Sequence, residues 1–62
     1  MTFYELRGKI QLEAFLEILD SDGYLLQEGV NGETMWEDDL LDMPVYLILP
    51  GNSSTKIILE NN

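Results

Sequence analysis

Residues 18–26, Ile18-Leu19-Asp20-Ser21-Asp22-Gly23-Tyr24-Leu25-Leu26, contain two apolar runs joined by a four-residue turn. Asp suits the first position of such a turn, and Gly23 supplies the positive φ of a type I turn followed by a bulge. Upstream, side chains alternate with period two from Ile10 to Leu19, as is typical of a strand. We therefore predict a hairpin with strands over 10–19 and 24–29 and with Ile18 opposite Leu26.

A helix is the competing interpretation of 10–19, because Gln, Leu, Glu and Ala are good helix formers. Its apolar arc would be too wide for so small a protein to cover, and the segment runs directly into the hairpin turn. We therefore prefer the strand. Phe15 and Leu19 then lie on the opposite face from Ile18, so that either the helices cover this face or it is a contact surface.

Two capping boxes predict short helices on either side of the hairpin. Thr2-Phe3-Tyr4-Glu5 begins a helix over 3–9, which Gly8 helps to end. Thr34-Met35-Trp36-Glu37 begins a second helix over 35–42, with acidic residues in its first turn, and Pro44 stops it.

A second hairpin follows. The apolar run 45–49 predicts a strand buried on both faces, residues 50–54 form a turn, and 55–60 pair back. We expect Leu47 opposite Ile57 and Val45 opposite Leu59.

These elements predict an α+β fold with a single domain over 1–62. The order is α-β-β-α-β-β, and we expect the two hairpins to join in one antiparallel sheet with short helices. An all-β small barrel is the alternative. A chain of 62 residues buries only about 60% of its unfolded surface, which makes self-association a reasonable expectation.

The layout resembles a loose group of small acidic proteins encoded by bacterial phages and mobile elements. The resemblance spans most of the chain and rests on three short strings: 8–10 (Gly-Lys-Ile), the hairpin 18–26, and 39–45 (Asp-Leu-Leu-Asp-Met-Pro-Val). It carries no catalytic motif, and it implies a genomic context more than an activity.

Charge is the strongest functional signal in the chain. Twelve acidic and three basic residues give a net charge of −9 at pH 7. Ten of the carboxylates lie between Ile10 and Thr55, where there is no Lys, Arg or His. Such a field repels nucleic acid and anionic membranes and favours basic partners.

The sequence contains few residues that could support catalysis or bind a cofactor. The chain has neither Cys nor His, which removes thiolate ligands and the usual near-neutral base. A calcium loop counted from Asp20 would need Gly and Glu where Leu25 and Asn31 stand. We therefore expect no enzyme, no cofactor and no metal. A carboxylate cation site remains a third, weaker alternative; its residues would be Glu33, Glu37, Asp38, Asp39 and Asp42.

We predict a small acidic module that binds a protein with a basic surface, and in a sharper form a nucleic-acid mimic that blocks a basic groove of a host enzyme. The candidate contact residues combine carboxylates with one aromatic side chain: Trp36, Glu37, Asp38, Asp39, Asp42, Glu13, Glu17 and Glu28. Trp36 could instead anchor the second helix on the sheet, and for a core this small we favour that role.

The alternative function is a structural or accessory subunit whose charge serves solubility. It would self-associate as a homodimer through an exposed strand edge. The chain has no basic start followed by a long apolar stretch, and its longest apolar run is 45–49. We therefore expect a cytoplasmic protein without direct contact to membrane or nucleic acid.

Overall fold

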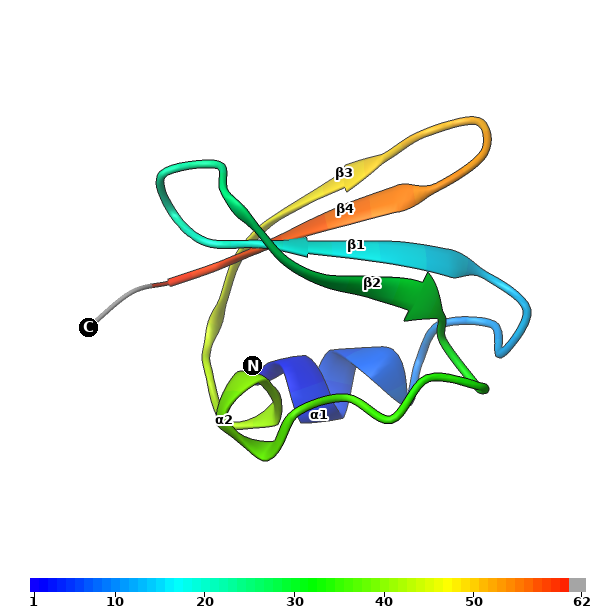
Figure 1. The fold of residues 1–62 in the computed structure, drawn as a ribbon, viewed down its shortest axis with the longest axis horizontal. Coiled ribbons are helices and arrows are strands. Elements are labelled where there is room, and N and C mark those ends of the chain that lie inside the picture. Colours follow the sequence, from blue (N-terminus) through cyan, green and yellow to red (C-terminus); the bar gives the residue numbers. More distant parts are fainter. Residues whose placement is uncertain (61–62) are drawn as a thin grey trace.

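The computed structural model describes residues 1–60 and contains two short helices and one four-stranded sheet (Figure 1). The elements are α1 (Phe3–Arg7), β1 (Phe15–Leu19), β2 (Leu25–Val30), α2 (Asp38–Leu41), β3 (Val45–Pro50) and β4 (Thr55–Leu59). Their order is the predicted one. The sheet is open, with the strand order β2-β1-β4-β3, so the barrel alternative is wrong.

The centre of the sheet corrects the prediction of a purely antiparallel arrangement. Each hairpin is antiparallel, but β1 and β4 join them side by side as a parallel pair, with Ile18 beside Ile57. Hairpin chemistry fixes only the strands that a turn connects, whereas the β1–β4 pair depends on packing between distant segments.

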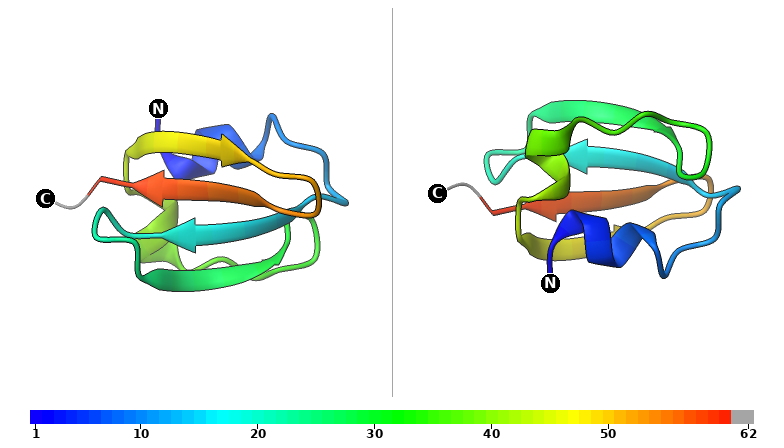
Figure 2. Two further views of the ribbon diagram at one scale, coloured as in Figure 1. Left: turned by 90° about the horizontal axis from the view of Figure 1, so that it is seen from above. Right: turned by 90° about the horizontal axis from the view of Figure 1, so that it is seen from below.

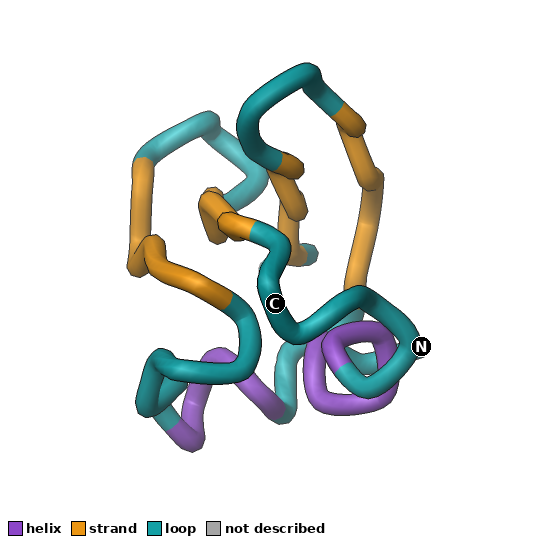
Figure 3. Tube along the Cα trace, turned by 90° about the vertical axis from the view of Figure 1, so that its right-hand side faces the viewer, coloured by secondary structure: helices purple, strands orange, loops and turns teal. Residues whose placement is uncertain are grey.

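Both helices lie on the same side of the sheet (Figures 1 and 3). The buried core fills the space between these two layers and consists of Phe3, Leu6, Leu16, Ile18, Trp36, Leu40, Ile57 and Leu59. Successive side chains of a strand point to opposite faces, so the residues between these core positions lie on the side without helices. Figure 2 shows that side of the sheet uncovered in its left view and the helix layer in its right view.

The first capping box is confirmed. The backbone N–H of Glu5 donates to the Thr2 hydroxyl, and the Glu5 carboxylate accepts from the Thr2 N–H at 2.9 Å. The helix is shorter than predicted and ends at Arg7, with Gly8 as its C-cap. Backbone hydrogen bonds fix its N-terminal end to the start of β3, since the N–H of Val45 donates to the carbonyl of Met1 at 2.8 Å.

The first strand begins at Phe15 and not at Ile10, because a buried asparagine holds residues 10–14 in turns. Asn31 is fully buried, and its Nδ2 donates to the carbonyl oxygens of Arg7, Ile10 and Gln11 at 2.9–3.3 Å. The Asn31 side chain thus satisfies the last carbonyl of α1 and two carbonyls of the following loop. In the predicted strand, the two loop carbonyls would have had to find their partners in the sheet.

The second capping box is wrong. The Thr34 hydroxyl donates to the carbonyl of Val30 at 2.7 Å and does not cap a helix. The N-cap of α2 is Glu37, without a side-chain hydrogen bond, and α2 has only four residues. Ser and Thr hydroxyls often donate to nearby backbone carbonyls, and here the Thr34 hydroxyl forms that bond in place of a helix cap.

Both hairpin registers shift by one residue from the prediction at a bulge. Ile18 pairs with Gln27, while Leu19 pairs with Leu25. In the second hairpin Val45 pairs with Leu59 as predicted, but Leu47 pairs with Ile58 and not with Ile57. The expectation that 45–49 is buried on both faces is also wrong, because β3 is an edge strand and its residues from Tyr46 onward are exposed.

Candidate functional site

The carboxylates of the chain all lie at the surface of the fold. Ten of the twelve are exposed, and Glu17 and Asp20 are half-buried. Of the three basic residues, Lys9 and Lys56 are exposed, while Arg7 is half-buried and its guanidinium donates to the carbonyl of Asn31 at 3.2 Å. The negative charge of the fold therefore faces solvent, whereas Arg7, one of the three basic residues, forms a hydrogen bond within the fold.

The acidic segment around α2 forms the first group of candidate residues. Glu37 is the N-cap, Asp38 and Asp39 occupy the first turn, and Asp42 is the C-cap; all four are exposed. Leu40 anchors the helix in the core, and Gln27 of β2 holds the segment before it by accepting from the N–H of Glu37 at 3.1 Å. Within residues 1–60, no three of these or other carboxylates lie close enough together to hold a metal ion.

Glu17 and Glu28 form a second group on the other side of the molecule. They are direct partners in the β1–β2 register, between the inward-facing pairs Leu16–Gly29 and Ile18–Gln27. Their side chains therefore point away from the helix layer. The predicted contact residues thus fall on two opposite surfaces, with α2 on one and this pair on the other, while Glu13 lies in the loop before β1.

The surface around Glu17 and Glu28 is apolar. We call the helix-free side of the sheet the open face, and its apolar residues are Phe15, Leu19, Leu25, Leu26, Leu47, Leu49 and Ile58. Leu47 and Leu49 keep 44% and 43% of their surface exposed. Sequence periodicity located Phe15 and Leu19 on this side, but it missed the contribution of β3 and β4 because the parallel β1–β4 pairing was not foreseen.

Trp36 belongs to the core and offers little area to a partner. It is only 8% exposed, its ring packs edge-on against Phe3 with centroids 5.2 Å apart, and its Nε1 donates to the carbonyl of Asn31. This is the anchoring role favoured in the sequence analysis. The aromatic side chains that do face solvent are Tyr4, Tyr24 and Tyr46, together with Phe15 on the open face.

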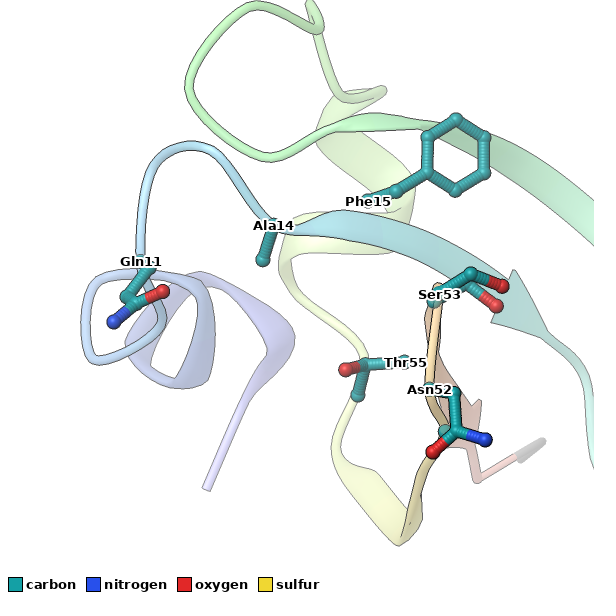
Figure 4. A pocket seen from close by; sticks show the side chains of 8 residues that line it. Gln11, Ala14, Phe15, Asn52, Ser53 and Thr55 are labelled. Carbon is teal, nitrogen blue, oxygen red and sulfur yellow. The ribbon is translucent and has the colours of Figure 1, made fainter.

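A shallow hollow of about 280 Å³ lies between the loop before β1 and the β3–β4 turn (Figure 4). Its lining combines hydroxyl, amide and apolar groups and contains no ionisable side chain: Gln11, Ala14, Phe15, Gly51, Asn52, Ser53, Ser54 and Thr55. Beside it, the Ser54 hydroxyl donates to the Glu17 carboxylate at 2.6 Å, which joins this end of the molecule to the open face. Such a lining can donate and accept hydrogen bonds, but it holds no general acid, base or activated nucleophile.

Comparisons with protein families, with curated proteins and with solved structures give no significant match. Neither helix in residues 1–60 has the length and apolar character needed to cross a bilayer.

Proposed function

We propose that this protein is a small acidic interaction module that binds a basic surface of a larger protein. The observation that carries the proposal is the placement of charge: every carboxylate lies at the surface, and the only exposed cationic side chains of residues 1–60 are Lys9 and Lys56. A net charge of −9 on a body whose Cα extents are 29 × 22 × 17 Å raises the rate at which a basic partner is encountered.

In its sharper form, the module mimics a nucleic acid. Carboxylates lie on two opposite surfaces, with the α2 acids on one and Glu17 and Glu28 on the other. A body that carries carboxylates on two opposite surfaces could sit between two walls of a groove lined with Lys and Arg, in the place of a phosphate backbone. The resemblance to acidic proteins of phages and mobile elements suggests a nuclease, repair enzyme or polymerase of the host as the target class.

The proposal is tested by affinity capture with the parent and with a variant in which the four α2 acids become amides, Glu37→Gln, Asp38→Asn, Asp39→Asn and Asp42→Asn. We expect the parent to retain a nucleic-acid-binding protein from a bacterial extract, to release it with salt, and to lose it to competing DNA. The variant should retain much less of it. Equal retention by both proteins, or capture that DNA does not compete, would refute the proposal.

Self-association is the second candidate, and the apolar open face is the observation that favours it. Light scattering over a range of protein concentrations separates the two. A mass that rises to that of a dimer would support the subunit function, whereas a constant monomer mass would argue against it.

A further inference from the structure

The open face is a sheet surface that nothing in the described chain covers. Apolar residues from all four strands contribute to it, whereas the opposite side of the same strands packs against the helices. The largest contiguous apolar patch on a soluble monomer is often a functional contact surface.

A row of charges crosses this apolar surface. Glu28, Glu17 and Lys56 are register partners on three neighbouring strands, β2, β1 and β4. Two carboxylates placed directly opposite each other on a sheet are destabilising. Lys56 and the Ser54 hydroxyl lie beside Glu17, whereas Glu28 on the edge strand β2 has only Glu17 as its register partner. A cation supplied by a partner next to Glu28 would relieve the remaining repulsion.

Further acids frame one end of the same surface. The turn between β1 and β2 carries Asp20 and Asp22, and Glu60 follows β4 at the same end of the sheet (Figure 2). An occupant of the open face would therefore meet carboxylates both within the apolar surface and along its rim. A partner that complements this surface would therefore present an apolar stripe flanked by Lys or Arg residues.

A second copy of the chain fits this surface poorly. Figure 2 shows the strands running along the long dimension of the molecule, and the Cα extents of 29 and 17 Å bound the face. Stacking two such faces would bring four carboxylates, Glu17 and Glu28 of each copy, into one contact. Each copy would also bring nine net negative charges to the other.

We propose that the open face binds an amphipathic helix with a basic polar side, presented by the partner; this rests on the proposed function and assigns its docking surface. Strands of five or six residues span about 17–20 Å, the length of a helix of about 12 residues. A helix about 10–12 Å wide fits within the 17 Å Cα extent of the molecule across the strands. Its apolar stripe packs on the leucines and Phe15, and its basic residues reach Glu17 and Glu28. The acids of α2, on the far side, accelerate the encounter without touching the helix.

The probe is a fluorescent peptide of about 14 residues with Leu at helical i, i+3, i+4, i+7 spacing and Lys elsewhere. Fluorescence anisotropy measures its binding to the full chain. Leu47→Ser with Leu49→Ser should weaken binding by about tenfold or more, because both side chains lie on the open face. The control, Tyr4→Ser with Met35→Ser, removes apolar side chains from the helix side that are 63% and 92% exposed, more than either leucine, and should change binding by less than about twofold.

A second variant keeps the test valid if the serine variant fails to fold. Glu17→Gln with Glu28→Gln leaves the apolar surface intact and should weaken binding and lower its salt dependence. The α2 amide variant should slow association with little change in dissociation. A peptide of the same composition with Leu spread around the helix should bind weakly.

The outcomes separate this inference from the proposed function. Loss of binding in the α2 amide variant, with none in the open-face variants, would overturn the docking surface and leave the acidic module standing. Failure of the peptide to bind any form of the protein would overturn both. A dimer in light scattering that the Leu47 and Leu49 substitutions dissolve would show that a second copy covers the face, and would overturn the inference.

Discussion

The pair Glu17–Glu28 allows a quantitative test of how the open face is built. The two residues are direct register partners, so their Cβ atoms lie about 4.5–5.5 Å apart. Two carboxylates about 6 Å apart repel by roughly 0.7 kcal/mol in water, and by about half of that at 0.1 M salt. Glu28→Lys replaces this repulsion with an attraction of similar size. We therefore expect the free energy of unfolding to rise by about 0.5–1 kcal/mol.

Urea denaturation at low ionic strength measures the effect, because urea leaves the charge interactions unscreened. Glu33→Lys is the matched control: Glu33 is also exposed, and its substitution changes the net charge equally without touching the pair. The gain from Glu28→Lys should exceed that of the control, shrink in high salt, and shrink again when Glu17 is already Gln. Equal gains in both lysine variants would refute the specific repulsion, and with it the idea that the open face holds unfavourable charge ready for a partner.

Three further predictions concern the parts of the fold that hold the face in place. Asn31→Ala should lower the free energy of unfolding by about 1–3 kcal/mol in urea denaturation, because part-buried carbonyls at and after the end of α1 lose their donor; an unchanged free energy of unfolding would contradict this. Gly23→Ala should cost about 1 kcal/mol in the same assay, since Gly23 has a φ of 93°, and an unchanged midpoint would count against the turn geometry. Hydrogen bonds from the Thr2 backbone and hydroxyl hold the pKa of Glu5 below its usual 4.5, so the cap is complete above pH 4.5 and is lost as the pH falls through the lowered value. Unfolding midpoints between neutral pH and pH 3 should therefore fall less in Glu5→Gln than in the parent, and parallel curves would show that the cap does not titrate.

Local chemistry explains which parts of the fold were predictable. The cap formed by Thr2 and Glu5, and the turn ending at Gly23, depend on residues within four positions of each other. Period-two alternation correctly placed Phe15 and Leu19 on the opposite face from Ile18, because it reports the face of a residue whatever strand lies beside it. It left open which of the two faces the helices cover.

The remaining features depend on contacts that a linear pattern does not contain. The parallel pairing of β1 with β4 follows from packing, and each bulge shifts a register by one residue without a clear sequence signal. The apolar run 45–49 predicts a strand buried on both faces, but an edge strand on an uncovered face has the same sequence signature. The sequence pattern likewise does not show that the candidate acids divide between two opposite surfaces, because that division depends on how the sheet and α2 pack together.

The most direct test of the docking surface is a nitrogen-15 NMR titration of the protein with the Leu/Lys peptide. We expect the amide shifts that change to concentrate on β1, β3 and β4 around Leu19, Leu47 and Ile58, with a contribution from Glu28 on β2. Residues of α2 should move little. Changes confined to α2 and the acidic segment before it would show instead that the partner binds the helix side and that the open face has another role.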